Sequence, residues 1–210
     1  MNSAERIALV ESIILSVERA DPSRSLDDLP RRFVKFDEEK GEVANDWLAL
    51  SSAGNGKRRT PADLLEEIVD ALVVATDLAL TPMDILESEA LRIDLVFEAM
   101  HVVNNSLMCE HITPSCPDAV PNLFGHMSTQ QGRLLRYVRL HNGRLAFHAA
   151  RELFGLTLTL ALLPLPELPK ATTDMRLREM ADLVDRKVGK WLANVAAGKD
   201  SITLPAEAIT

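Results

Sequence analysis

Apolar residues recur with a helical period along almost the whole of this 210-residue chain, and this pattern limits the fold more than any other feature. Residues 3–20 give the first example, with a single apolar stripe made of Ile7, Val10, Ile13, Ile14 and Val17. The short β-branched runs all lie inside such helical stretches, and none alternates as a half-buried strand would. The sequence therefore predicts an all-α fold.

Proline and capping residues divide this pattern into separate helices. Residues 21–23 (Asp-Pro-Ser) end the first helix, and residues 60–63 (Thr-Pro-Ala-Asp) offer a hydroxyl N-cap and a first-turn proline for the third. Residues 71–80 are apolar on nearly every side and are expected at the centre of the molecule. The expected helices cover residues 3–20, 30–50, 60–80, about 82–107 with a break near Ser88, 128–140, 144–163 and 173–195.

The chain is predicted to have two helical halves. Residues 111–126 contain three prolines and few periodic apolar positions, so they are expected to be a linker. This division gives a four-helix catalytic domain over residues 1–110 and a second helical domain over residues 127–210.

The second half resembles the first with its acidic residues replaced. When residues 38–43 are set beside 129–134, and 66–71 beside 151–156, the glycine and the apolar pattern are retained. The acidic positions change as follows: Glu39 to Gln130, Glu42 to Arg133 and Asp70 to Gly155, whereas Glu67 is matched by Glu152. We interpret this as a degenerate repeat without a metal site, which makes the chain an internal pseudo-dimer. Chance similarity between amphipathic helices is the alternative.

Composition excludes several classes of protein. The net charge of −8 argues against binding to a nucleic-acid backbone, which requires a basic surface. The apolar stretch at residues 153–163 ends at Pro164 and is too short to span a bilayer, and the N-terminal residues lack the basic and apolar regions of a signal peptide. Two cysteines, Cys109 and Cys116, do not form a disulfide framework. We therefore expect a cytoplasmic protein without nucleic-acid or membrane partners.

Two pairs of carboxylates, Glu39-x-x-Glu42 and Glu67-x-x-Asp70, are the main chemical feature of the sequence. Residues three apart on a helix share a face, and both pairs lie within apolar helical patterns. Four like charges at the edge of a core are unfavourable unless a cation offsets them, and oxygen ligands favour Mg²⁺ or Mn²⁺. The sequence thus predicts a metal site, with two solvated helix faces as the alternative. Asp77, two turns beyond Asp70, is either a supporting carboxylate or a solvated residue.

Residues 35–43 (KFDEEKGEV), followed by residues 66–72 (EEIVDAL), resemble the MazG-like, all-alpha nucleoside triphosphate pyrophosphohydrolases. This superfamily includes dimeric dUTPases and phosphoribosyl-ATP pyrophosphohydrolase, and its signature is E-x-x-E followed after a gap by E-x-x-D. A third segment, residues 97–107, is similar to the family pattern F-x-x-x-H-x-x-N-M-S-K through His101, Asn105 and Ser106. The family lysine is replaced by Leu107. The resemblance covers residues 30–107.

The resemblance implies a Mg²⁺-dependent hydrolase that converts a nucleoside triphosphate to the monophosphate and pyrophosphate, in nucleotide-pool metabolism. The acidic quartet would hold the metal, and Glu38 or Glu39 would accept a proton from water. The side chains expected to contact the substrate lie on the loop after the first acidic helix, on that helix and on the fourth helix: Lys57, Arg58, Arg59, Trp47, His101 and Asn105. Further dimerisation of the chain stays open.

Each of these roles has a structural alternative. The basic residues 57–59 also suit a solubilising loop, Trp47 continues an apolar stripe, and His101 and Asn105 also suit a helix-packing seam. Arg133 and Arg136 either form a solvated face or reach across to the substrate phosphates. For the whole chain, the alternatives are a catalytically inactive nucleotide- or protein-binding module derived from such enzymes, and a helical interaction module whose acidic pairs are accidental.

Overall fold

A computed structural model describes residues 1–20, 26–51, 59–86, 89–105 and 118–196. Within these ranges the chain is entirely helical, which confirms the all-α prediction. The seven α-helices of the described ranges are α1 (Ser3–Ala20), α2 (Leu29–Ser51), α3 (Pro61–Leu86), α4 (Glu89–Asn105), α5 (Ala119–Arg139), α6 (Gly143–Leu162) and α7 (Thr173–Ala196). One 3₁₀ turn, η1 (Leu26–Asp28), precedes α2.

Most predicted boundaries are close to those of the structure, and three differ. Helix α4 begins at Glu89 rather than near Pro82. Helix α3 continues to Leu86, six residues past the expected end, because its buried face extends through Thr81. Helix α5 begins at Ala119, so the second part of the segment predicted as a linker is helical. Its prolines misled the prediction, although Pro121 lies in the first turn of α5, where a proline is tolerated.

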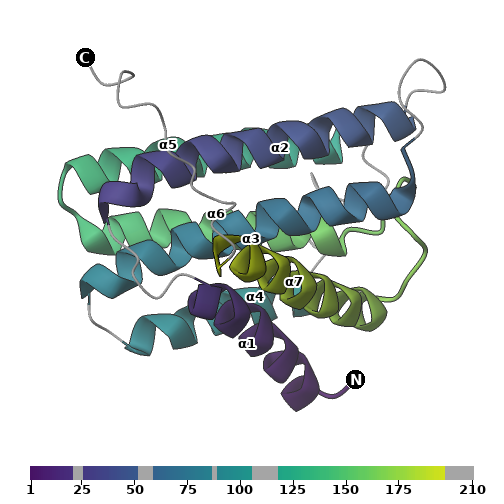
Figure 1. The fold of residues 1–210 in the computed structure, drawn as a ribbon, viewed down its shortest axis with the longest axis horizontal. Coiled ribbons are helices and arrows are strands. Elements are labelled where there is room, and N and C mark those ends of the chain that lie inside the picture. The colour runs from purple at the N-terminus through teal and green to yellow at the C-terminus, as the bar shows by residue number, and fades with distance from the viewer. Residues whose placement is uncertain (21–25, 52–58, 87–88, 106–117, 197–210) are drawn as a thin grey trace.

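The helices form three layers (Figure 1). Helices α2 and α5 make the first layer, α3 and α6 the second, and α1, α4 and α7 the third. The closest packing joins α2 to α3, α5 to α6, and α3 to α6, while α7 packs on α1 and α3 and α4 packs on α6. The buried apolar side chains form one continuous core with members from all seven α-helices.

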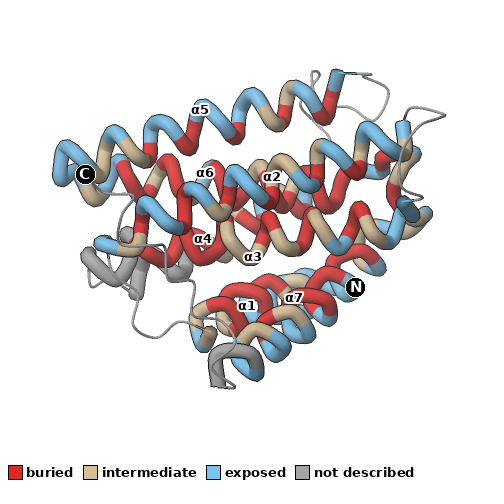
Figure 2. Tube along the Cα trace, turned by 45° about the horizontal axis from the view of Figure 1, so that its top comes forward, coloured by how far each residue is buried: buried red, intermediate tan, exposed pale blue. Residues whose placement is uncertain are grey.

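The two middle helices are buried on most sides, as the red segments of Figure 2 show. For α3 this matches the prediction that residues 71–80 are central, since residues 75–81 are all buried. Helix α6 as a whole, at 20 residues and with a mean hydropathy of 1.3, has the length and composition of a membrane-spanning segment. However, 67% of this apolar segment is buried inside the molecule, so its apolar surface serves packing.

Local interactions fix the start of α3 where the sequence predicts it. The Thr60 hydroxyl accepts a hydrogen bond from the backbone N–H of Asp63 at 3.2 Å, and the Asp63 carboxylate accepts one from the backbone N–H of Thr60 at 2.7 Å. This reciprocal arrangement satisfies two amide groups that a helix N-terminus leaves without partners. Because α3 carries the second acidic pair, the cap also fixes the register of that pair.

A buried ion pair joins α2 to α3. The Arg32 guanidinium donates a hydrogen bond to the Asp77 carboxylate, and both residues are buried. Asp77 is therefore neither a solvated residue nor a carboxylate facing the predicted metal site. A buried pair of this kind is costly to break from one side only, so it holds the two acidic helices in a defined alignment.

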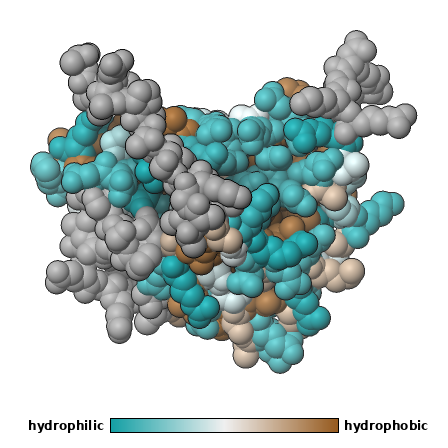
Figure 3. Space-filling model, in the orientation of Figure 1, coloured by the Kyte–Doolittle hydropathy of each residue, from teal (hydrophilic) through white to brown (hydrophobic). Residues whose placement is uncertain are grey.

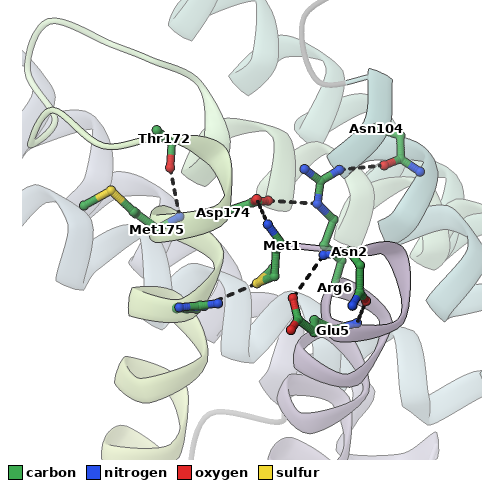
Figure 4. Close-up of polar contacts among 9 residues, drawn as sticks. Met1, Asn2, Glu5, Arg6, Asn104, Thr172, Asp174 and Met175 are labelled. Atoms are coloured by element: carbon green, nitrogen blue, oxygen red, sulfur yellow. Dashed lines mark hydrogen bonds and ion pairs between the residues drawn. The ribbon is translucent and has the colours of Figure 1, made fainter.

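Polar contacts also tie α7 to α1 and α4 (Figure 4). The Asp174 carboxylate of α7 accepts hydrogen bonds from Arg6 Nε and from the Met1 amine, each at 2.8 Å. The same Arg6 donates to the side-chain oxygen of Asn104 on α4 at 3.1 Å. These contacts fix the N-terminal end of α7, the helix whose later turns reach the acidic residues of α3.

Candidate metal centre

Three of the four predicted metal ligands come together between α2 and α3. One carboxylate oxygen from each of Glu39, Glu67 and Asp70 lies within 4.8 Å of the other two. Glu39 is only 6% exposed, whereas Glu67 and Asp70 are half-buried. Glu42 is exposed and is not part of this group, but its side chain hydrogen-bonds to Glu67. The cluster thus has three converging acids and a fourth attached to one of them.

The two helices carry matching acidic stripes that include two residues absent from the predicted quartet. On α2, Asp46 follows Glu42 by one turn; on α3, Asp63 precedes Glu67 by one turn. Burial raises the pKa of Asp46, and the negative charges of Asp63 and Glu42 add to the rise, which places these residues near one another. Glu39, Glu42 and Asp46 follow one another at helical spacing in the sequence, so Asp46 could have been added to the candidate site.

Burial and mutual repulsion raise the pKa values of the clustered acids. Burial raises the pKa of Glu67 to about 7, helped by its hydrogen bond to Glu42 and by the charges of Glu42 and Asp70. Burial also raises the pKa of Glu39 and of Asp70, although a neighbouring lysine opposes the rise in each case. The site therefore favours the protonated acids, and a cation that offset their charge would reverse this preference.

Two lysines partly neutralise the cluster from opposite sides. Lys35 of α2 lies 2.7 Å from a Glu39 oxygen and 3.1 Å from a Glu38 oxygen. Lys187 of α7 donates a hydrogen bond to Asp70 and lies 3.9 Å from Glu66. The sequence analysis did not single out Lys187, because nothing in the spacing connects a residue on α7 with an acid 117 positions earlier.

Glu38, predicted to be catalytic, lies outside the cluster. Its side chain is 55% exposed, and it pairs with Lys35 on the outer surface of α2. Helical geometry explains this placement, because consecutive residues point about 100° apart and only Glu39 can face α3. Glu38 is therefore not one of the converging acids.

Arg59 is the member of the predicted basic loop that the structure describes, while Lys57 and Arg58 lie outside the described residues. Its Nε lies 2.8 Å from Asp46 Oδ1, and Asp46 is only 3% exposed. The second oxygen of Asp46, Oδ2, is buried and has no hydrogen-bond partner among the described residues. Arg59 thus neutralises an acid of the α2 stripe, and it leaves one buried carboxylate oxygen unsatisfied.

The other predicted substrate residues are Trp47, His101 and Asn105. Trp47 is half-buried and packs against the hydrophobic core. His101 lines a cavity of about 760 Å³ between α1 and α4, together with Ile7 and the 69%-exposed Phe97, and no cluster acid lines that cavity. The side chain of Asn105 lies outside the described residues. The structure therefore does not bring His101 to the acidic residues.

The replaced positions of the second half are occupied differently. Gln130 is buried and accepts a 3.4 Å hydrogen bond from Arg133, which is exposed, as is Arg136. Gly155 is buried against α4, where an added Cβ would lie 3.2 Å from Glu98 Oε1. Among the described residues, the cation that reaches the acidic cluster from the second half is Lys187 of α7, rather than either arginine of α5.

Comparisons with protein-family models, with curated proteins and with solved structures find no match to this chain.

Proposed function

We propose that this protein is a Mg²⁺-dependent nucleoside triphosphate pyrophosphohydrolase that releases pyrophosphate and a nucleoside monophosphate. The observation that carries the proposal is the convergence of Glu39, Glu67 and Asp70 from two helices at the place where the E-x-x-E and E-x-x-D pairs meet. Burial of the cluster makes accidental spacing a poor explanation, since bare like charges at the edge of a core are unfavourable.

The donor set suits a hard divalent cation. All candidate ligands are carboxylate oxygens, which Mg²⁺ and Mn²⁺ prefer over nitrogen or sulfur donors. The unsatisfied Oδ2 of Asp46 is a further buried oxygen on the same stripe of α2. A bound Mg²⁺ would offset charge on the phosphate oxygens and acidify a water molecule. Glu39, Glu67 and Asp70 would hold it.

The remaining residues have roles that follow from their charges. Glu42 is exposed and hydrogen-bonds to Glu67 without being one of the three acids that would hold the metal, so it is the carboxylate left to accept the proton of the attacking water. This replaces Glu38 in that role. Lys35 orients Glu39 through their ion pair.

We also propose that the chain is a fused pseudo-dimer whose first half forms a four-helix MazG-like unit with the metal site. The packing supports this, since α2–α3 and α5–α6 form two hairpins joined through α3 and α6, with α7 on α3 and α4 on α6. The charges at the two outer contacts are reversed. Lys187 faces Glu66 and Asp70 on α3, whereas Glu98 of α4 lies 3.4 Å from Arg151 on α6.

One observation favours a second candidate, the helical interaction module whose acidic pairs are accidental. Lys187 already neutralises Asp70, as in an ion-pair network that serves only to hold α7 on α3. A cation site and a structural network make opposite predictions for added Mg²⁺, so the two are separable by experiment.

The test measures pyrophosphate release from a panel of nucleoside triphosphates with and without Mg²⁺. We expect release from at least one nucleotide, lowered by about 100-fold or more in Glu39→Gln and Asp70→Asn, because each removes a metal-binding charge. Glu152→Gln is the matched control, since Glu152 occupies the corresponding position in the second half and is exposed. Release that is unchanged in both site variants would refute the assignment, and metal-dependent stabilisation without any release would favour the binding module.

A further inference from the structure

A second cavity lies directly beside the acidic cluster and is formed mainly by α7. Its volume is about 350 Å³, and one wall is made of Glu66 and Asp70 from α3. The other wall is a run of α7 residues with helical spacing: Leu183, Arg186, Lys187, Lys190 and Trp191. Three cations and an indole ring therefore face two of the acids that border the candidate metal centre.

The cations are concentrated on this side of α7 because its opposite side is used for packing. The buried side consists of apolar residues that join the common core: Leu177, Met180, Ala181, Val184 and Val188. Leu183, at 6% exposure, gives the cavity an apolar inner surface, and Trp191 is half-buried. Hydrophilic residues cover most of the face of the molecule on which α7 lies (Figure 3). The cavity thus combines an apolar inner surface and an aromatic side chain with a charged rim.

Only one of the three cations is engaged with the acids of the opposite wall. Lys187 pairs with Asp70 and lies near Glu66, whereas Arg186 and Lys190 are exposed at the cavity. A cavity with surplus positive charge at one side, next to an acidic cluster at the other, favours a ligand that carries anionic oxygens. Lysine and arginine are the usual partners of phosphate groups.

We propose that this α7 cavity holds the substrate, with the phosphate chain against Arg186, Lys187 and Lys190 and the base against Trp191. The inference rests on the proposed function for the identity of the ligand as a nucleoside triphosphate. An aromatic ring contributes stacking to any base, so Trp191 gives affinity without fixing the base. The second half then supplies the substrate-binding residues, while the first half supplies the acids.

The test measures binding rather than activity, in the full chain carrying Trp47→Phe. This change leaves Trp191 as the sole tryptophan, because the chain contains two. The probes are α,β-methylene analogues of nucleoside triphosphates with Mg²⁺, in which the bond to be cleaved is blocked, and inorganic tripolyphosphate. We expect the analogues to quench Trp191 fluorescence saturably, and tripolyphosphate to compete with them without quenching to the same extent.

Charge variants identify the site. Lys190→Met and Arg186→Met should each weaken analogue binding by about ten-fold, the effect of losing one charge-assisted hydrogen bond. Arg178→Met on the same helix is the matched control, because Arg178 is exposed and contacts Met1 rather than the cavity. Both site residues are exposed, so the variants should fold, and thermal unfolding checks this.

The outcomes separate this inference from the proposed function. Unchanged analogue affinity in both charge variants, with Mg²⁺-dependent pyrophosphate release intact, would overturn the α7 site and leave the hydrolase assignment standing. Weakened affinity without any pyrophosphate release would support the α7 site in a binding protein. Equal quenching by tripolyphosphate and by the analogues would overturn the contact between the base and Trp191.

Discussion

Replacing Glu67 by glutamine should remove a pH dependence of stability that the acidic cluster creates. The folded protein binds a proton at Glu67 up to about pH 7, whereas an unfolded glutamate releases it near its ordinary pKa of 4.5. Between these values the folded state binds more protons than the unfolded state, so the free energy of unfolding must fall as the pH rises. Glutamine has no proton to release and keeps nearly the same shape, so the variant should lack this contribution.

The size of the effect follows from the difference between the two pKa values. A difference of about 2.5 in pKa corresponds to at most about 3.4 kcal/mol. Glu67 is half-buried, so solvent screening reduces the expected contribution to about 1–2 kcal/mol. For a chain of this size this is a fall of about 2–8 °C in melting temperature between pH 5 and pH 8 that the variant should not show.

Thermal unfolding without divalent cations, recorded from pH 5 to pH 8, measures the effect as the difference in slope between the protein and Glu67→Gln. Glu42→Gln should reduce the slope as well, because Glu42 hydrogen-bonds to the protonated Glu67. Glu152→Gln is the control and should leave the slope unchanged. Added Mg²⁺ should stabilise the protein more at pH 8 than at pH 5, since metal binding requires deprotonated carboxylates.

Parallel slopes for the protein and Glu67→Gln would refute this reasoning, because they would show that Glu67 titrates alike in the folded and unfolded states. If the stability of the protein rose from pH 5 to pH 8, and the rise were smaller in Glu67→Gln, Glu67 would be held ionised in the folded state. Either result would mean that the acids are neutralised by Lys35 and Lys187 more fully than their burial indicates.

Three other substitutions test the framework around the site by thermal or chemical unfolding. Thr60→Ala should destabilise the protein by about 1 kcal/mol through loss of the N-cap of α3, whereas the same change at an exposed mid-helix position should not. Asp77→Ala should cost about 3–5 kcal/mol because it removes the carboxylate that pairs with the buried Arg32 guanidinium; a much smaller loss would show that this pair does not hold α2 on α3. Gly155→Asp should destabilise the protein by about 1–3 kcal/mol, because the new carboxylate would meet Glu98. The change should not add a second metal site. A gain in stability would contradict the expected clash with Glu98.

The sequence predicted the helices well because their signals are local. Apolar periodicity, the Asp21-Pro22 break and the Thr60 cap depend on residues within one or two turns, and the resulting helices α1, α3 and α7 begin within a residue of their predicted starts. The linker was harder to predict, since prolines both break helices and begin them. The start of α5 at Ala119 depends on the second property.

The candidate site was predicted only as far as helical geometry extends. The spacing of three places Glu67 and Asp70 on one face, and burial of that face brings them to Glu39. The arrival of α7 depends on the packing of helices distant in sequence, so Lys187 and Trp191 left no local signal. His101 was predicted from a family pattern and not from helical geometry, and it lines a cavity between α1 and α4 to which no acid of the cluster contributes.

In the proposed pairing of the two halves, the second half lacks a metal site and supplies the α7 cavity, and both differences follow from the same symmetry. Each outer helix packs on the middle helix of the other half, so a change at one contact has a counterpart across the molecule. At the first contact, cations of α7 face the acids of α3; at the second, Glu98 of α4 faces Arg151 and lies close to Gly155. A second cation site would place positive charge beside Arg151, which the lost acids no longer offset.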